Sequence, residues 1–521
     1  MSAANGEIAS IANKPETMEQ KMNIDDVLQV KYIFGYDGQC KNNIHYISDD
    51  KSSSTMSKLL YTAGHNLVFL YYESRGEQTY IHGTEGTTAI TCMNLSPSKR
   101  YLAFSEEADY GIIYVYDLKS ISSDKDRSEW KPKRKKILTT QESGSRKYTH
   151  LSFSTKEEGK YLAALADGNV PKIILWEWDK GKAKVSVEVT GFQLINQMFF
   201  HPTEDFVCVL GQGNNPIKFY VQKPDKNEII FQHKSDMVKD SIRQYSNNFL
   251  SYCLLPENHC IIGTEEGELL HMNAHYELKT KLPSSPYDEF QIRCIVPHSK
   301  GFLIGGSNAT FYIYDKNDRD IRAPYTRIER RIQNKDAEYA NLCINSCTLI
   351  NDDTIVCGFE NGSLMEVPFS NEKTTPEDKF HFDHLILPFH TATITDFDIC
   401  LRKTLLATCS MDKYVKIWNY TDFTLENSKE FEQAAQAITF HPSGFHLAVA
   451  FSDRVKMLNI LYNEKKNDLR CPKDINIKNC TELSYSNGGH LLAVANGSMI
   501  QVYGVYSGEQ ISAFAMRGKI F

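Results

Sequence analysis

The stretch HTATITDFDICLRKTLLATCSMDKYVKIWNY, residues 390–420, decides the fold. His390, Thr408, Asp412 and Trp418 stand at the spacing of a WD repeat, which places a His, a Ser or Thr, a turn Asp and a Trp in this order. The Asp carboxylate can accept turn N–H groups and the imidazole N–H, and the imidazole and indole can both reach the Thr hydroxyl. We predict that these four residues form a structural tetrad that fastens the inner strands of one blade.

The apolar part of this stretch, LLATC at 405–409, recurs along the chain. Similar runs are YLAFS (101–105), YLAAL (161–165), FVCVL (206–210), CIIGT (260–264), FLIGG (302–306), TIVCG (354–358), HLAVA (446–450) and LLAVA (491–495). Each run is too short for a helix and has the residue types of a strand buried on both faces. Turn sequences such as Ser96-Pro97-Ser98 and Asn361-Gly362 bracket the runs and indicate hairpins.

The repeat length predicts a propeller. A further strand in each unit ends on a bulky residue, and the first and last of these, Tyr71 and Tyr503, are 432 residues apart over nine intervals. The period is therefore about 48 residues, close to a four-stranded propeller blade with loop insertions. We predict an all-β chain of ten WD40-type blades. Seven blades, from Asn43 to about His381, close one ring, and about three belong to an incomplete second propeller.

These counts divide the chain into three parts. Residues 1–26 are expected to be a disordered leader, 27–386 the first propeller, and 387–521 the first blades of the second. The segment VLQVKYIF at 27–34 is predicted to be a strand that completes the outer edge of the last blade of the ring. Three blades cannot bury both end faces, so we expect a longer protein, or a partner, to supply the missing blades.

Composition excludes several classes of function. Lys and Arg total 58 against 65 Asp and Glu, so the net charge of −7 gives no general attraction for nucleic acid or anionic membranes. No apolar run approaches the ~20 residues of a membrane helix, and an intracellular protein is expected. The thirteen cysteines form no C-x-x-C pair, and we interpret residues such as Cys208, Cys260, Cys357 and Cys409 as buried reduced thiols.

The sequence contains no H-E-x-x-H, G-x-S-x-G or G-x-x-x-x-G-K-[ST] motif. The stretch Gly211-Gln-Gly213 resembles a dinucleotide loop but precedes a strand, so we interpret it as a hairpin turn. Asp352 and Asp353 are expected in a hairpin. His201 and His441 each precede Pro in the same kind of turn, which favours turn structure over metal binding. We predict no catalytic, cofactor or metal site, and no enzymatic activity.

Two basic segments remain as candidate contact surfaces. The first, in the long insertion after Tyr116-Asp117, contains Lys131, Lys133, Arg134, Lys135 and Lys136, and the second contains Arg319, Arg322, Arg327, Arg330 and Arg331. One interpretation is a solvated loop in each case. The alternative is contact with an acidic partner, such as a tubulin surface or an acidic protein segment.

Five stretches in order resemble the amino-terminal part of the cilia- and flagella-associated protein 57 family. They are NNIHY (42–46), SPSKRYLAFSE (96–106), LRKTLLATCSMDKYVKIWNY (401–420), HPSG (441–444) and SYSNGGHLLAVANG (484–497). The resemblance covers about 41–517. HPSG and a WD ending occur in any WD protein, whereas the long middle stretch and SNGGHL are more specific.

The resemblance implies two consecutive propellers followed by a coiled coil, and a non-enzymatic scaffold in the axoneme of motile cilia. It implies as partners inner-arm dynein, the nexin-dynein regulatory complex or radial-spoke subunits on doublet microtubules. The chain has no heptad-rich stretch, so functions of the coiled coil are not expected of it. Three alternatives stay open: another ciliary tether or radial-spoke component, a general cytosolic WD40 interaction platform, and an enzyme acting at the central channel.

Overall fold

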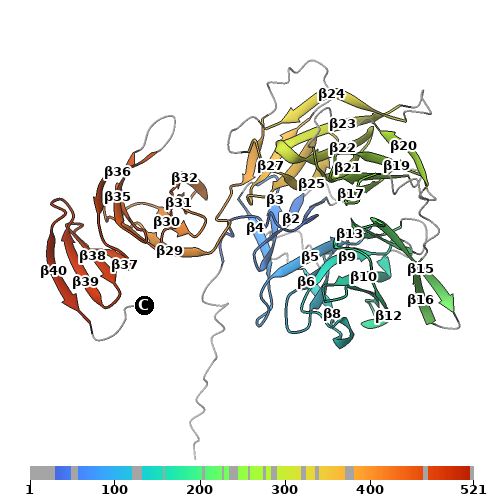
Figure 1. Ribbon diagram of the computed structural model, residues 1–521, viewed down its shortest axis with the longest axis horizontal. Coiled ribbons are helices and arrows are strands. Elements are labelled where there is room, and N and C mark those ends of the chain that lie inside the picture. Colours follow the sequence, from blue (N-terminus) through green and yellow to red (C-terminus); the bar gives the residue numbers. More distant parts are fainter. Residues whose placement is uncertain are drawn as a thin grey trace, which may run out of the picture.

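The computed structural model describes residues 30–48, 57–74, 76–119, 132–155, 159–201, 206–225, 228–233, 245–255, 259–273, 277–282, 290–317, 324–334, 339–369, 381–461 and 468–516. The predicted leader, 1–26, lies outside these residues. The described residues form ten four-stranded antiparallel sheets, which confirms the ten predicted blades (Figure 1). They contain no helix long and apolar enough to cross a membrane.

Seven blades form a ring. Blade 1 is β1 (Ile44–Ile47), β2 (Lys58–Ala63), β3 (Asn66–Tyr71) and β4 (Gln78–His82); blade 2 is β5 (Ile90–Leu95), β6 (Tyr101–Glu106), β7 (Ile112–Asp117) and β8 (Lys133–Leu138); blade 3 is β9 (Tyr148–Phe153), β10 (Tyr161–Ala166), β11 (Lys172–Glu177) and β12 (Lys182–Glu188); blade 4 is β13 (Leu194–Phe200), β14 (Phe206–Gln212), β15 (Ile217–Asp225) and β16 (Glu228–His233).

Blade 5 is β17 (Phe249–Leu254), β18 (Cys260–Thr264), β19 (Leu269–Met272) and β20 (Leu278–Leu282); blade 6 is β21 (Ile292–His298), β22 (Gly301–Gly306), β23 (Thr310–Lys316) and β24 (Tyr325–Gln333); blade 7 is β25 (Ile344–Asn351), β26 (Thr354–Phe359), β27 (Leu364–Pro368) and β28 (Asp383–Ile386). The described residues also include the short 3₁₀ helices η2 (Gln141–Ser143) and η7 (Ser307–Ala309), which lie between strands.

The remaining three blades form an open arc beside the ring (Figure 1). Blade 8 is β29 (Ile394–Ile399), β30 (Leu405–Ser410), β31 (Tyr414–Asn419) and β32 (Thr424–Glu430); blade 9 is β33 (Ala437–Phe440), β34 (His446–Ala450), β35 (Val455–Leu461) and β36 (Asp468–Ile475); blade 10 is β37 (Cys480–Tyr485), β38 (Leu491–Asn496), β39 (Met499–Gly504) and β40 (Gln510–Ala515).

Apolar packing between neighbouring blades holds both parts together. The second strands are buried almost throughout, as their continuous apolar runs predict. In the ring, seven clusters of buried side chains join successive blades, and the seventh joins blade 7 back to blade 1. In the arc, one cluster joins blades 8 and 9 and another joins blades 9 and 10. A closed ring of seven blades has seven interfaces, whereas an arc of three has two.

The ring closes without an exchanged strand, so the prediction for 27–34 is wrong. Residues 30–36 contain no strand, and 27–29 lie outside the described residues. Blade 7 supplies its own outer strand β28, which pairs with β27 and leaves no vacant place beside it. Closure instead combines apolar packing with side-chain hydrogen bonds. For example, the Tyr72 hydroxyl donates to Glu366 Oε2 at 2.9 Å, and the Ser346 hydroxyl donates to Asn43 Oδ1 at 3.1 Å.

A bulge recurs near the start of the inner strand in most blades. The side chain of the bulged residue reaches the next blade. Thr91 Oγ1 donates to the Tyr148 carbonyl at 2.6 Å, and Thr395 Oγ1 donates to the Ala435 carbonyl at 2.8 Å. Asn196 and Asn345 hold the same place in other blades. These bonds satisfy backbone groups that the bulge leaves out of the ladder, and they fix the spacing of the blades around the axis.

Candidate functional site

The four predicted tetrad residues lie together in blade 8. His390 precedes β29, Thr408 lies in β30, Asp412 in the turn after it and Trp418 in β31. His390 Nδ1 lies 2.9 Å from Asp412 Oδ2, and His390 Nε2 lies 2.8 Å from Thr408 Oγ1. The indole Nε1 of Trp418 donates to the same hydroxyl at 3.0 Å. The network therefore joins the segment before the inner strand to the second and third strands.

Asp412 also organises the turn that carries it. Its carboxylate accepts the backbone N–H groups of Tyr414 at 2.9 Å and Thr391 at 3.1 Å. Burial acts to raise the pKa of Asp412, but the hydrogen bonds from His390 and from these two N–H groups outweigh it and hold the pKa below its usual range. Since both titratable side chains are used in structural hydrogen bonds, the arrangement supports a blade fastener and offers no free acid or base.

Blade 3 shows what happens when the hydroxyl is missing. Trp176 in β11 pairs with Leu162, as Trp418 in β31 pairs with Leu406. Two residues further along its strand, blade 3 has Ala164 where blade 8 has Thr408. Trp176 is 2% exposed, and its indole N–H has no hydrogen-bond partner among the described residues. Blade 3 therefore keeps the packing of the WD repeat without its hydrogen-bond network.

The other polar residues singled out from the sequence lie in turns. His441 follows β33, with Nδ1 2.7 Å from the Ser443 hydroxyl and Nε2 3.0 Å from the Gly489 carbonyl, so it links the equivalent turns of blades 9 and 10. His201 follows β13, and its ring stacks on Phe206. The described residues contain no group of three or more His, Cys, Asp or Glu side chains that could hold a metal ion.

The glycine pair and the paired carboxylates also fall in hairpins. Gly211 lies at the end of β14, and its N–H donates to the Pro216 carbonyl across the turn to β15, as the hairpin interpretation expects. Asp352 and Asp353 connect β25 to β26, and the N–H of Asp353 donates to the Asn351 side chain. All thirteen cysteines are unpaired, and Cys208, Cys260, Cys357 and Cys409 are buried.

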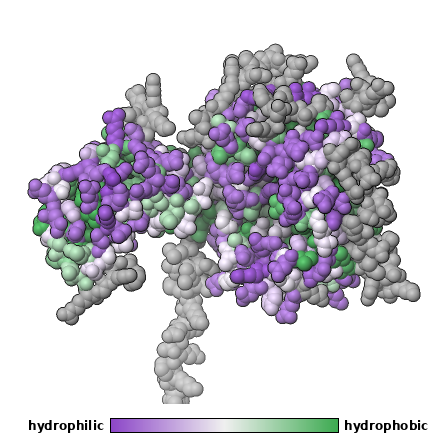
Figure 2. Space-filling model, in the orientation of Figure 1, coloured by the Kyte–Doolittle hydropathy of each residue, from purple (hydrophilic) through white to green (hydrophobic). Residues whose placement is uncertain are grey.

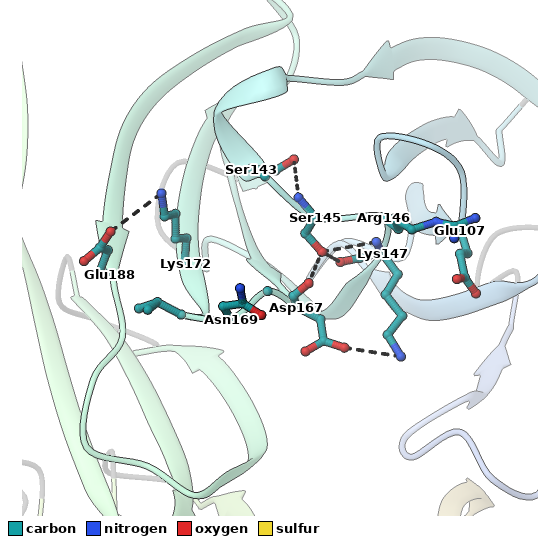
Figure 3. Close-up of a pocket in the computed structure, with 12 residues that line it drawn as sticks. Glu107, Ser143, Ser145, Arg146, Lys147, Asp167, Asn169, Lys172 and Glu188 are labelled. Atoms are coloured by element: carbon teal, nitrogen blue, oxygen red, sulfur yellow. Dashed lines mark hydrogen bonds and ion pairs between the residues drawn. The ribbon is translucent and has the colours of Figure 1, made fainter.

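A polar hollow of about 560 Å³ lies on one face of the ring, between the loops of blades 2 and 3 (Figure 3). Its charged groups are largely paired: Lys147 Nζ lies 3.2 Å from Asp167 and Lys172 Nζ lies 3.6 Å from Glu188. The Ser145 hydroxyl donates to the carbonyls of Lys147 and Asp167, which holds the two loops together. The hollow is thus a polar surface whose charged side chains are largely paired with one another.

The described parts of both basic segments are strands, so the interpretation as solvated loops is wrong for them, and Lys131 lies outside the described residues. Lys133, Arg134, Lys135 and Lys136 form the outer strand β8 of blade 2, with the first three exposed. Lys135 pairs with Asp117 at 3.6 Å, and Arg134 lies over the ring of Tyr114. In the second segment, Arg327, Arg330 and Arg331 fall in β24, and Arg319 and Arg322 lie outside the described residues. Lys and Arg on such edge strands oppose edge-to-edge pairing.

Sequence reasoning missed an aromatic cluster at the junction of ring and arc. The ring of Tyr32 stacks on Phe423 with centroids 4.2 Å apart, and Phe34 contacts Phe389 at 5.9 Å and Trp418 at 5.3 Å. The main chain of Ile33 meanwhile exchanges hydrogen bonds with the Gln78 side chain of blade 1. The pair of aromatic residues Tyr32 and Phe34 is the available signal, but alternating aromatic residues equally indicate a strand.

Apolar side chains are exposed mainly on the arc. Figure 2 shows an apolar patch at the end of the arc that carries blade 10. Ile511 is 62% and Phe514 55% exposed on β40, and Phe397 is 62% exposed on β29 at the other end. In the ring the equivalent faces are covered by the neighbouring blade. The two end faces of the arc therefore have the character of uncovered blade interfaces.

Comparison with known proteins identifies the motif and the relatives. The family model "WD domain, G-beta repeat" matches residues 384–419, the blade that carries the tetrad. Cilia- and flagella-associated protein 57 A of Tetrahymena thermophila is 38% identical over 96% of this chain and 40% of its own length. Cilia- and flagella-associated protein 57 of Mus musculus is 26% identical over 93% of this chain and 40% of its own. The chain thus spans about 40% of the length of these relatives.

More distant similarities include a protein that is named as microtubule-associated and a solved β-propeller domain. Echinoderm microtubule-associated protein-like 4 of Xenopus tropicalis is 21% identical over 93% of this chain and 50% of its own length. Among solved structures, the β-propeller domain of Myceliophteria thermophila Cps50 (Swd1) matches 73% of this chain and 97% of its own, with 14% identity and a TM-score of 0.35.

Proposed function

The chain belongs to the cilia- and flagella-associated protein 57 family over the length that it spans, and we propose that it is a non-enzymatic scaffold of the motile-cilium axoneme. In this proposal its propeller surfaces dock inner-arm dynein and regulatory complexes on doublet microtubules. The observation that carries the proposal is the 38% identity to the Tetrahymena protein over 96% of the chain. A match over that share of the chain spans the surface loops as well as the core repeats that any WD protein shares.

The chemistry of the described residues agrees with a scaffold. The tetrad of blade 8 and the turn histidine His441 use their polar atoms in hydrogen bonds within or between blades. The hollow beside Ser145 is lined by ion pairs. Neither place presents an acid and a base that converge on open space, which general acid–base catalysis requires. Ten blades instead offer a large set of loops and outer strands for protein contacts.

The outer strand β8 is our candidate contact surface for an acidic partner. Lys133, Arg134 and Lys135 are exposed along an unpaired edge, and among the described residues of blade 2 the ion-pair partner of this strand is Asp117. Clustered positive charge of this kind attracts acidic surfaces. One distant relative is named as microtubule-associated, so we include tubulin among the candidate partners together with axonemal subunits.

Lysine-directed cross-linking and mass spectrometry on isolated axonemes test the proposal. We expect cross-links to inner-arm dynein, the nexin-dynein regulatory complex or radial-spoke subunits. The lysines of β8 should cross-link to an acidic partner more often than Lys182, an exposed lysine on the outer strand of blade 3. Equal labelling of both strands, without reproducible partners, would remove β8 from the proposal.

Fractionation of cilia separates the axonemal scaffold from a general cytosolic platform. We expect the protein to remain with the axoneme after detergent extraction. A protein found wholly in the detergent-soluble matrix contradicts the axonemal proposal, because a docking scaffold on doublet microtubules must be retained with them.

A further inference from the structure

The inner strands of the seven ring blades all begin at one mouth of the central channel, because every blade repeats the same strand order. Lys41 lies three residues before β1, in the segment leading into blade 1. Its Nζ donates to Asn196 Oδ1 at 3.1 Å, in the inner strand of blade 4. Blades 1 and 4 are on nearly opposite sides of a seven-membered ring. The side chain of Lys41 therefore extends across the mouth of the channel.

The loop that carries Lys41 is fixed by blade 7. Asn345 Nδ2 donates to the Gly38 carbonyl at 2.8 Å. A Cβ on Gly38 would lie 2.2 Å from the Phe359 carbonyl oxygen, so only glycine allows this close approach. Within the loop, Asn43 Nδ2 donates to the Asp37 carbonyl at 2.7 Å. The ammonium group is consequently held at the mouth by a preorganised loop.

Arg293 brings a second positive charge to the same mouth. It is the bulged residue of β21 in blade 6, the place that Thr91, Asn196 and Asn345 hold in other blades. Its guanidinium donates to Asn345 Oδ1 at 3.1 Å and to Gln291 Oε1 at 3.1 Å. A short neutral side chain makes the bridge between blades elsewhere, so the bridge alone does not require an arginine.

No carboxylate neutralises either cation. Lys41 and Arg293 form no ion pair among the described residues, and both bond only to amide oxygens. The nearby carboxylate of Asp37 accepts from the Gln39 N–H and the Cys40 thiol, and that of Glu265 accepts from Asn248. An ammonium has three donors and a guanidinium five, so both groups retain unused N–H donors.

The pKa of Lys41 reports the same imbalance. Partial desolvation of the ammonium group lowers the pKa of Lys41, and the positive charge of Arg293 lowers it further, although the residue as a whole is exposed. His150 in β9 donates from Nε2–H to the Asn196 carbonyl at 2.8 Å, and burial lowers its pKa to about 4, so it is neutral at pH 7. Two like charges that act on each other without a carboxylate between them raise the free energy of the empty site.

We propose that this mouth of the channel, with Lys41 and Arg293 as its charged donors and Asn196 between neighbouring blades, binds an oxyanion. The ligand is a phosphate or carboxylate group, carried either by a small molecule or by an acidic side chain of a partner segment. An oxyanion supplies the missing negative charge and accepts the unused N–H donors. This inference goes beyond the scaffold function and does not depend on axonemal location.

Isothermal titration calorimetry on the 521-residue chain tests the site at constant ionic strength. One arm uses inorganic phosphate, and the other uses an acetylated, amidated tetraglutamate peptide with the tetraglutamine peptide as its neutral control. We expect saturable one-to-one binding in at least one charged arm and none of the tetraglutamine peptide. Binding of phosphate alone assigns a small anion, and preference for tetraglutamate assigns an acidic partner segment.

Matched variants locate the site. Lys41→Met and Arg293→Gln should each weaken binding by at least about tenfold, because each removes a charge-assisted hydrogen bond. Lys99→Met is the control, since Lys99 is also an exposed lysine that donates to one protein oxygen, the Tyr46 carbonyl. Circular dichroism establishes that each variant is folded. Absence of saturable binding by the wild-type chain overturns the proposal without any variant, as does unchanged affinity in folded Lys41→Met and Arg293→Gln.

Discussion

The ring and the arc use the same blade but differ in what covers it. Each blade of the ring has two neighbours, whereas blades 8 and 10 each have one. Twelve of the seventeen exposed large hydrophobic side chains among the described residues follow residue 387, although the arc has far fewer blades. The arc nevertheless contains the complete tetrad. Closure, and not the quality of the individual blade motif, therefore determines which apolar faces are covered.

The last outer strand of the arc also differs from two outer strands of the ring. In the ring, β8 has the sequence KRKKIL and β12 has KAKVSVE, so charged side chains protect the free edge. The last strand of the arc, β40, has the sequence QISAFA, with no charge and with Ile511 and Phe514 exposed. Such an edge is suited to be covered by another element. The comparison predicts that another element must cover the end faces of the arc for it to reach its full stability, whereas the ring is stable without one.

The largest effect is expected at the interface that closes the ring. Leu59 in β2 is fully buried in the cluster between blades 1 and 7. Leu59→Ala should lower the free energy of unfolding of the ring by about 2–5 kcal/mol, because it leaves a cavity in a close-packed interface. Hydrogen–deuterium exchange with mass spectrometry measures the loss of stability separately for peptides of the ring and of the arc.

Ile511→Ala is the matched control for that variant. The Ile511 side chain is 62% exposed at the end face of the arc, so its truncation should change stability by less than about 0.5 kcal/mol. If Ile511→Ala were as damaging as Leu59→Ala, the end face would have to be buried in solution, and the contrast between ring and arc would fail.

The next effect concerns the tetrad. His390→Ala or Asp412→Ala leaves buried hydrogen-bonding atoms of blade 8 without partners, at a cost of roughly 1–3 kcal/mol. Faster exchange should be confined to peptides of the arc, since no buried cluster joins blade 7 to blade 8 among the described residues. Glu432→Ala, which removes an exposed carboxylate near blade 8, is the control. A melt unchanged by both tetrad variants rules out the fastening role.

Acidification should weaken blade 8 through Asp412. The pKa of Asp412 is lower in the folded chain than its ordinary value near 3.9, because hydrogen bonds to the carboxylate outweigh burial. Its ionised form therefore stabilises the fold above that ordinary value, and this contribution is lost as the pH falls through the lowered pKa. Asp412→Asn should remove this part of the acid sensitivity in hydrogen exchange of blade 8. If the wild-type chain and Asp412→Asn had the same pH profile, the assignment of this acid sensitivity to Asp412 would be wrong.

A smaller effect is expected at the junction of ring and arc. Tyr32→Ala removes the stack on Phe423, which is worth about 0.5–1.5 kcal/mol beyond the buried area. Peptides around Phe423 and the 30–36 segment should then exchange faster, while blades 1–7 keep their protection. Tyr506→Ala is the control, because this side chain is 80% exposed on blade 10. Loss of protection throughout the ring would show that the Tyr32 stack also supports the closure of the ring, to which Tyr36 and Ile33 already contribute apolar contacts.

The sequence predicted the features that repeat and missed those that depend on a single partner. Short apolar runs and turn residues recur in every blade, so ten blades could be counted. Residues 30–34 have strand propensity, but a strand forms only where an edge is vacant, and β28 already occupies that edge of blade 7. A run of lysine and arginine is typical both of a solvated loop and of a free strand edge, so the sequence of β8 does not distinguish the two. Lys41 and Arg293 could not be associated, since blades distant in sequence bring them together.

The smallest expected effect refines the comparison between blade 8 and blade 3. Ala164 and Thr408 hold equivalent places, and only Trp418 has a hydroxyl for its indole N–H. Ala164→Ser should offer Trp176 a partner and stabilise blade 3 by up to about 1 kcal/mol, because a buried unsatisfied donor is costly. Ala164 is fully buried, so crowding by the added oxygen opposes this gain. Thermal melts of Ala164→Ser and of the similarly sized hydrophobic control Ala164→Cys separate the gain from the hydrogen bond from the cost of crowding. If Ala164→Ser stabilises the chain and Ala164→Cys does not, the hydrogen bond to Trp176 forms. If both variants destabilise the chain equally, blade 3 has no room for a hydroxyl at this position and does not use the WD hydrogen-bond network.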